Sequence, residues 1–210
     1  MPHPKTQLCN QCPITQRPIA APHMDITALI PLILSGDSRA YAEVVRTYEH
    51  MVYTVCHRVL RSTEDAEEAT QDAFVKAYQH LASYNGQAKF STWLYSIAYR
   101  TAVSHGRNRR MESSSLDDMH HHPKAEHVDE LRRNEAAHHL GKALACLSPE
   151  DSAILSFFHL DELSVEEIVT VTGLGASNVK VKLHRARKKL LEVLNKELGA
   201  EAHDLLLEHA

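Results

Sequence analysis

The distribution of proline constrains this chain more than any other feature of its sequence. Of the eight prolines among its 210 residues, six lie within residues 1–31, and the other two are Pro123 and Pro149. Between Leu32 and His122 there is no proline and there are only three glycines. Because proline removes a backbone donor and clashes with the preceding helical turn, a tract this long without it favours helices.

Apolar residues in this tract recur every three or four positions, which is the spacing of one face of an α-helix. Two such faces are visible, the first within residues 44–60 and the second within residues 66–81. No segment shows sustained alternation of apolar and polar residues, and Asn85-Gly86 joins two helical patterns rather than two strands. We therefore predict an all-α fold.

The segment at residues 111–131 interrupts the helical patterns. It is rich in serine, acids and histidine and contains Pro123, a composition that is typical of a flexible linker. We expect two small helical domains joined by this linker. In chain order, the expected segments are a disordered tail at 1–24, a helical domain at 25–110, the linker at 111–131, a second helical domain at 132–197, and a tail at 198–210 with a short helix.

The composition excludes several classes of protein. A net charge of −4 excludes a uniformly basic nucleic-acid coat, although it allows a local basic patch. No stretch of about 18 uncharged apolar residues is present, so we expect no membrane span, and the first residues do not resemble a secretory signal. Four cysteines are too few for a disulfide scaffold here, which favours a cytoplasmic location. We expect Cys56 and Cys146, in apolar helical patterns, to be buried.

Capping residues mark two helix starts in the C-terminal part. Ser148 precedes Pro149, which suits an N-cap followed by proline at the first helical position. Ser164 and Glu167 have the spacing of a capping box. The helix that Ser164 opens is short and ends at Gly173, where glycine allows a positive φ.

A basic amphipathic helix follows that glycine. Six lysine and arginine residues fall within residues 180–189 without a single acid. A short capped helix, a glycine turn and a basic helix are the parts of a helix-turn-helix, whose second helix enters the major groove. Segregation of positive charge in a chain of net charge −4 indicates contact with phosphates.

The N-terminal domain carries an acidic face. Residues 64–72 hold five acids, and helical spacing leaves five polar side chains outward: Glu64, Glu67, Glu68, Gln71 and Asp72. Such a face suits a protein partner with a basic surface rather than DNA.

Aromatic residues gather in the next segment. Residues 84–99 hold five aromatic side chains in a chain that is 6% aromatic, and arginines follow within residues 107–110. Rings beside cations suit unpaired bases, which stack while the backbone charge is neutralised. We expect Phe90 and Trp93 to belong to the core. The more accessible rings would be Tyr84, Tyr95 and Tyr99.

Three strings together resemble the extracytoplasmic-function (ECF) class of bacterial RNA polymerase sigma factors. They are the residues 65–74, 90–98 and 183–190, in this order and at this spacing. The resemblance covers residues 25–110 and 132–198. It implies a region 2 helical bundle and a region 4 helix-turn-helix in a sigma factor that binds core RNA polymerase. Such a factor directs promoter-specific initiation by recognising the −35 and −10 elements and capturing melted DNA.

The resemblance also assigns contacts. Polymerase would be bound by Glu67, Glu68, Gln71 and Asp72. The −10 element would be contacted by Tyr84, Asn85, Lys89, Tyr95, Tyr99, Arg100, Arg107, Arg109 and Arg110, with a flipped base captured by the loop at residues 84–89. The −35 element would be contacted by Ser177, Asn178, Lys180, Lys182, His184, Arg185, Arg187, Lys188 and Lys189. An anti-sigma factor is a further implied partner.

Two other functions stay open on the sequence. A helix-turn-helix regulator that binds DNA by itself would need a ligand pocket or a dimerisation surface in residues 25–110. A metal-dependent redox sensor would use a CxxC motif that is only half of a zinc site. Its candidate ligands would be His3, Cys9, Cys12, His23 and His120–His122. No nucleophile–base or paired-carboxylate arrangement indicates an enzyme, and we expect neither metal nor cofactor.

Overall fold

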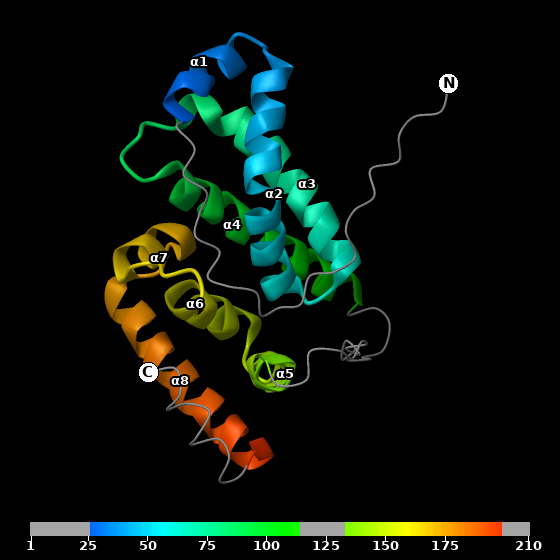
Figure 1. Cartoon of the computed structure of the whole chain (residues 1–210), viewed down its shortest axis with the longest axis vertical. Helices are drawn as coiled ribbons and strands as arrows, with labels where there is room; N and C mark the ends of the chain where they lie inside the picture. Colours follow the sequence, from blue (N-terminus) through cyan, green and yellow to red (C-terminus); the bar gives the residue numbers. More distant parts are fainter. Residues whose placement is uncertain (1–25, 114–132, 199–210) are drawn as a thin grey trace.

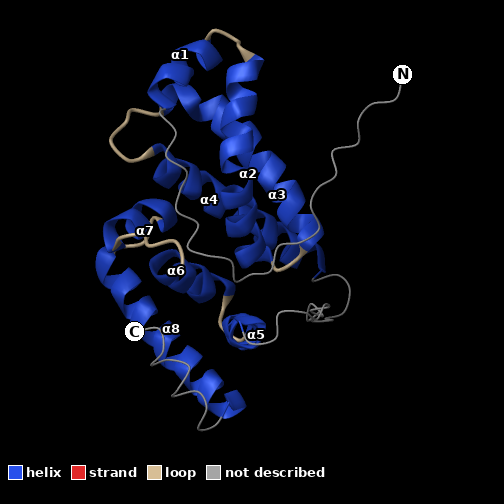
Figure 2. Ribbon diagram, viewed as in Figure 1, coloured by secondary structure: helices blue, strands red, loops and turns tan. Residues whose placement is uncertain are grey.

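The computed structural model describes residues 26–113 and 133–198, and every regular element in those two ranges is a helix (Figures 1 and 2). The predicted all-α fold is therefore confirmed. The expected tail at 1–24, the short helix expected near the C-terminus and all the candidate metal ligands lie outside the described residues. Within those ranges, no helix is long and apolar enough to cross a lipid bilayer.

The N-terminal domain is a bundle of long helices. In chain order its elements are the 3₁₀ turn η1 (Ile26–Ala28), α1 (Leu29–Leu34), α2 (Ser38–Leu60), α3 (Thr63–His80), the 3₁₀ turn η2 (Leu81–Ser83) and α4 (Phe90–Ser113). Helices α2, α3 and α4 pack against one another (Figure 1). The two apolar faces predicted from the sequence form the core between them, and Cys56 is completely buried there, as expected.

A tight turn joins α2 to α3. Arg61 adopts a left-handed backbone conformation with a φ of 57°, and its N–H donates to the carbonyl of His57 at 2.8 Å. Ser62 then caps α3 by accepting a hydrogen bond from the N–H of Asp65 at 3.3 Å. A left-handed residue after the last helical turn is a common way to end a helix, and here it reverses the chain within two residues.

The C-terminal domain follows the predicted order of caps and turns. Its elements are α5 (Arg133–Ala145), α6 (Pro149–His159), α7 (Val165–Thr172) and α8 (Ala176–Leu198). Ser148 caps α6, and α7 begins with the predicted capping box, in which Ser164 and Glu167 exchange bonds of 3.1 and 3.0 Å. Gly173 ends α7 with a φ of 75°. The helix-turn-helix is thus built from α7 and α8.

Two helix ends differ from the prediction. Helix α4 continues to Ser113, past the expected boundary at 110, because Met111 and Glu112 favour a helix and no breaker precedes them. Helix α5 stops at Ala145, so that Cys146 lies in the turn that follows. Cys146 is exposed there, and the expectation that it is buried is wrong.

The two domains are in direct contact. Helix α4 packs against α7, and α2 packs against α6, so that the C-terminal domain covers one side of the N-terminal bundle (Figure 1). Buried side chains of both domains form one continuous apolar cluster. Nothing in the sequence patterns predicted this contact.

Candidate polymerase and nucleic-acid interfaces

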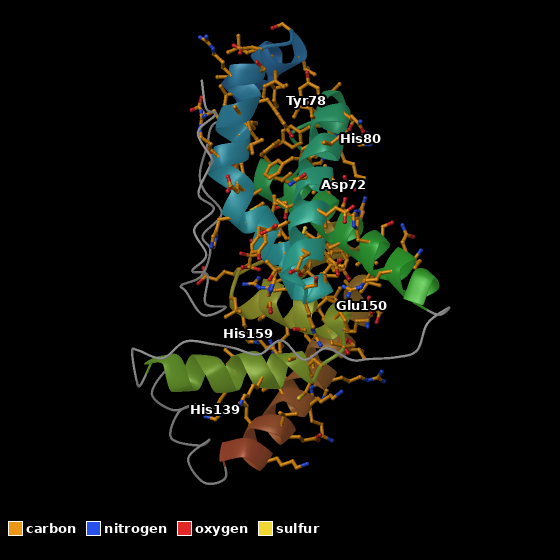
Figure 3. All side chains as sticks on the ribbon, turned by 90° about the vertical axis from the view of Figure 1, so that its right-hand side faces the viewer. Asp72, Tyr78, His80, His139, Glu150 and His159 are labelled. Atoms are coloured by element: carbon orange, nitrogen blue, oxygen red, sulfur yellow. The ribbon has the colours of Figure 1, made fainter. Side chains whose placement is uncertain are left out.

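The acidic face predicted on α3 is present and accessible. Glu67, Glu68 and Gln71 are exposed, while the alanines on the opposite side of the helix are completely buried. Asp72 is only half-exposed, because its Oδ2 lies 2.8 Å from Nε2 of His105 on α4. Figure 3 views α3 from the side on which Asp72 lies. The four residues predicted to bind polymerase therefore share one surface.

An apolar patch continues this surface toward the end of α3. Val75 is 56% exposed and Tyr78 is 46% exposed. They follow Gln71 by four and seven residues, which places all three on one side of the helix. Sequence analysis missed Val75 and Tyr78 because apolar residues are assigned to the core by default. For Val75 the available signal was that it is out of register with the buried Ala73 and Ala77. Tyr78 gave no such signal, because its spacing from Phe74 and Leu81 places it on the apolar face, and its exposure corrects that expectation.

The loop at residues 84–89 is held by Tyr84. The hydroxyl of Tyr84 donates to the carbonyl of Ala88 at 2.9 Å. Its ring lies with its centroid 5.5 Å from those of both Phe90 and Trp93. Phe90 is buried and Trp93 is half-buried, in line with their expected place in the core, while Tyr84 stays partly accessible.

A cavity of about 440 Å³ opens beside this loop. Trp93, Ile97 and Arg100 of α4 line it, and Thr170 of α7 contributes to the lining from the C-terminal domain. An aromatic ring beside a guanidinium group is chemically suited to a stacked base with its phosphate. Both groups come from α4, and the loop contributes Ala88 to the lining.

Tyr95 and Tyr99 are not accessible in this arrangement, so the expectation of open rings is wrong for both. They are 1% and 5% exposed, and the ring of Phe157 from α6 meets them edge-on at 5.8 and 5.7 Å between centroids. Burial raises the pKa of both hydroxyls far above their usual value. The sequence showed one buried face of α4, but it did not show that the C-terminal domain supplies a second.

Two of the predicted DNA-binding cations are also turned toward the C-terminal domain. Nζ of Lys89 lies 3.3 Å from Oε1 of Glu167, and Nη2 of Arg100 donates to the carbonyl of Thr170 at 3.3 Å. Both side chains remain exposed in large part. These contacts leave the charges close to the cavity and the loop.

The arginines near the end of α4 have different surroundings. Arg107 is exposed, and Arg109 is 61% exposed although it forms an ion pair with Asp65 on α3. Asn85, in the loop, is also exposed. The side chain of Arg110 lies outside the described residues.

Helix α8 presents a basic, exposed surface. Its apolar stripe packs inward, with Val179, Leu183 and Ala186 buried. The exposed members of the predicted −35 set are Ser177, Asn178, Lys180, His184, Arg185, Arg187, Lys188 and Lys189. The structure therefore brings all but one of these residues to the solvent-facing side of one helix.

Lys182 is the exception on α8. Its ammonium group lies 2.7 Å from Oε2 of Glu150 and 3.3 Å from Oδ1 of Asp151, both on α6, and its side chain is 24% exposed. Burial opposes the charge, but bonds to the two carboxylates outweigh it and raise the pKa of Lys182. Arg187 is also engaged, because its Nε donates to His159 at 2.9 Å.

The chain matches two family models and a set of curated relatives. Residues 44–111 match sigma-70 region 2, and residues 138–190 match sigma-70 region 4. The chain is 30% identical to RNA polymerase sigma factor YlaC of Bacillus subtilis (strain 168) over 76% of its length and 94% of YlaC. It is 28% identical to the ECF sigma factor SigW of the same strain, over 81% of this chain and 97% of SigW. It is 29% identical to the ECF sigma-E factor of Escherichia coli (strain K12), over 77% of this chain and 90% of the sigma-E factor.

Two solved structures have a similar fold. CnrH, in complex with the cytosolic domain of CnrY, superposes with a TM-score of 0.56 at 22% identity and covers 80% of this chain and 96% of its own. RpoE of Bartonella quintana, in complex with the anti-sigma factor NepR, superposes with a TM-score of 0.55 at 19% identity. The match covers 81% of this chain and 94% of the RpoE chain. In the part of the chain that the structure describes, no cluster of three or more histidine, cysteine or acidic side chains could hold a metal ion.

Proposed function

The chain belongs to the ECF class of RNA polymerase sigma factors, and from this premise we propose which of its surfaces bind polymerase and which bind promoter DNA. Residues 25–110 act as region 2, which docks on core polymerase and holds the −10 element. Residues 132–197 act as region 4, which reads the −35 element. The protein directs initiation in the cytoplasm and carries out no chemical step itself.

The observation that carries this proposal is the separation of charge over one chain. Helix α3 offers an acidic face that ends in the exposed Val75 and Tyr78, and helix α8 offers exposed cations without an acid within residues 180–189. An acidic and partly apolar surface suits a basic protein partner, while a basic helix in a helix-turn-helix suits duplex DNA. A regulator that binds only DNA does not need the first surface to recognise its site.

The loop and the cavity support a role at melted DNA. The ring of Trp93 and the guanidinium group of Arg100 line a cavity of about 440 Å³ beside the loop at residues 84–89. A base extruded from the duplex could stack there, which would favour the melted state by mass action. The contact with one base is small, and docking on polymerase supplies most of the remaining binding energy.

An anti-sigma factor is a further proposed partner. RpoE of Bartonella quintana is held by such a factor in its solved complex. Pull-down with the purified chain from its own cells, followed by mass spectrometry, identifies the partner. Recovery of core polymerase subunits alone would contradict this part of the proposal.

Run-off transcription tests the main proposal. The purified chain is added to core RNA polymerase on a library of promoters, and transcripts are sequenced. We expect a defined subset of promoters to give transcripts only when both proteins are present. The free chain should bind the same duplexes poorly. Tight, specific duplex binding without polymerase would favour the stand-alone helix-turn-helix regulator instead.

A further inference from the structure

Two neighbouring side chains of α6 hold the guanidinium group of Arg187 on α8. Nε of Arg187 donates to Nε2 of His159 at 2.9 Å, and Cζ lies 5.0 Å from the centroid of the Phe158 ring. The rings of Phe158 and His159 meet edge-on, with their centroids 5.1 Å apart. Helix α6 packs against α8 (Figure 1), so both partners belong to the helix that supports the basic one. Arg187 is therefore fixed at two points although it is exposed.

The imidazole of His159 is the acceptor in this contact. Nε of an arginine carries a hydrogen and cannot accept, so Nε2 of His159 is the unprotonated nitrogen of the ring and the ring is neutral. Burial and, to a smaller degree, the charge of Arg187 lower the pKa of His159, which favours this neutral form. The histidine therefore orients Arg187 without contributing a charge of its own.

Other cations that the structure holds in place are bound to carboxylates. Lys182 is bound by two carboxylates of α6, and Arg58 on α2 forms an ion pair with Asp161, in the loop after α6. In both cases the partner compensates the charge that it holds. Arg187 is held instead by an aromatic ring and a neutral imidazole, so its positive charge is not compensated and stays available to an anion.

The outer edge of the Arg187 guanidinium group is free. Nη1 and Nη2 donate no hydrogen bond to any residue that the structure describes. Together they form a planar fork, which can bind two oxygens of one phosphate. Lys180 lies seven residues earlier on the same side of α8, near the end of the helix that is expected to reach base edges. Arg187 lies about 10 Å further along that side, which suits the sugar-phosphate backbone that borders the groove.

We propose that Phe158 and His159 are positioning residues, which fix Arg187 as a bidentate anchor for one backbone phosphate beside the −35 element. The proposal rests on the function proposed above. A mobile arginine loses conformational freedom when it binds, whereas Arg187 has lost much of this freedom before DNA arrives. The anchor sets the position of α8 on the duplex and contributes equally to every base sequence.

Nitrogen-15 NMR of the free chain tests the arrangement around Arg187. We expect its Nε–H to exchange with water more slowly than that of Arg46, an exposed arginine on α2 that serves as the internal control. His159→Leu removes the acceptor and should make the exchange fast, whereas His159→Gln keeps an acceptor oxygen and should restore slow exchange. In Arg187→Ala the pKa of His159 should rise toward its ordinary value, because one of the two causes that lower it is gone.

Promoter binding tests the anchor in the complex of the full chain with core polymerase. On a promoter that this complex transcribes, we expect Arg187→Ala and Arg187→Lys to bind about three- to tenfold more weakly, because lysine lacks the fork. His159→Leu and Phe158→Leu should each weaken binding about threefold, and His159→Gln should restore the affinity. Arg46→Lys is the matched control for Arg187→Lys and should bind as wild type does. For Arg187→Ala the salt slope should also fall by about one.

A double-mutant cycle separates positioning from a general effect on the fold. If His159 acts through Arg187, His159→Leu has no further effect on binding in the Arg187→Ala background. Equal losses in both backgrounds would overturn the positioning role, as would fast exchange at Arg187 in wild type or no rescue by His159→Gln. Wild-type affinity of Arg187→Lys would overturn the fork. If the wild-type complex bound no promoter, the proposed function would be contradicted instead, because the exchange rates are measured without polymerase.

Discussion

We expect individual side chains of the basic helix α8 to have two different roles on DNA. Lys180 is exposed near the start of the helix, where a recognition helix reaches base edges, and Lys188 is exposed two turns later, where phosphates remain within reach. Lys182 lies between them but is bound to Glu150 and Asp151 of α6. Any base contact by Lys182 would first have to break these bonds.

Substitutions of these lysines should separate the roles. We expect Lys180→Ala to cost about 1–3 kcal/mol on the cognate −35 element and to relax the preference at one or two base pairs. Lys188→Ala should weaken all sequences equally and lower the salt slope by about one. A −35 library assayed with each variant at two salt concentrations measures both. A changed base preference with Lys188→Ala alone would show that the helix docks differently.

Lys182→Met should act on stability as well as on DNA. The substitution leaves two carboxylates of α6 without their counter-charge, and we expect the free energy of unfolding to fall by about 1 kcal/mol. Lys180→Met, at an exposed position of the same helix, is the control and should change stability little. Urea unfolding of the two proteins measures the difference. Equal midpoints would show that the contacts to α6 contribute nothing.

Reversing a charge tests whether the acidic surface of α3 binds core polymerase. Asp72→Lys together with Gln71→Ala should weaken the binding of core polymerase by about 1–3 kcal/mol while the fold stays intact. Val75→Asp should weaken it further, because it places a charge in the apolar part of the same surface. Glu43→Lys, an exposed reversal on α2, is the control. Titration with labelled core polymerase gives the affinities, and unchanged values for the first variant would remove this surface from the proposal.

At the scale of elements, the short helix α7 depends on its cap. It has eight residues, too few to be stable alone, and the capping box of Ser164 and Glu167 satisfies its first N–H groups. Burial would raise the pKa of Glu167, but bonds from the Ser164 backbone and Lys89 lower it below its ordinary value. The same helix contributes to the lining of the cavity and contacts α4, so its order affects both interfaces.

Loss of the cap should destabilise the C-terminal domain. We expect Ser164→Ala to lower the free energy of unfolding by about 1 kcal/mol. Because the pKa of Glu167 is lower in the folded protein, its contribution is present above the unfolded value of about 4.3 and is lost as the pH falls through the folded pKa. Glu167→Gln should remove this pH dependence while keeping the cap. Unfolding curves at several pH values test it, and identical curves for wild type and Glu167→Gln would contradict it.

At the scale of the whole molecule, the closed contact between the domains sets which surfaces are free. The acidic face of α3 and the basic face of α8 are both exposed, whereas the aromatic face of α4 is covered. Tyr95 and Tyr99 are therefore not accessible to a partner unless this contact changes, whereas the two charged faces are accessible as they stand.

The N-terminal tail is predicted to be dispensable for transcription from a strong promoter. Residues 1–24 are rich in proline and carry no basic cluster. We expect a chain that lacks them to transcribe from a strong promoter nearly as well as the full chain, in the run-off assay described above. Stoichiometric zinc that is lost in Cys9→Ser, measured by mass spectrometry, would instead favour the metal-sensor interpretation.

Local patterns in the sequence determined the helices, their caps and the charge of their faces. Ser148, Ser164 and Gly173 begin or end helices as predicted, because capping depends on residues three or four positions apart. The acidic and basic surfaces could also be predicted from the sequence, because the helical period of 3.6 residues determines which side chains share a face. Such a period does not state what covers that face.

Only the tertiary structure decided which faces meet. Arg58 and Asp161 are 103 positions apart in the sequence, and no local pattern relates them. For the same reason, the burial of Tyr95 and Tyr99 and the engagement of Lys182 could not be predicted. The spacing of apolar residues identifies one buried face of a helix. A second face that another domain buries has no separate signal, because its tyrosines also occur on exposed helix faces. Packing between the two domains determines which element covers this second face, and that packing exists only once the whole chain has folded.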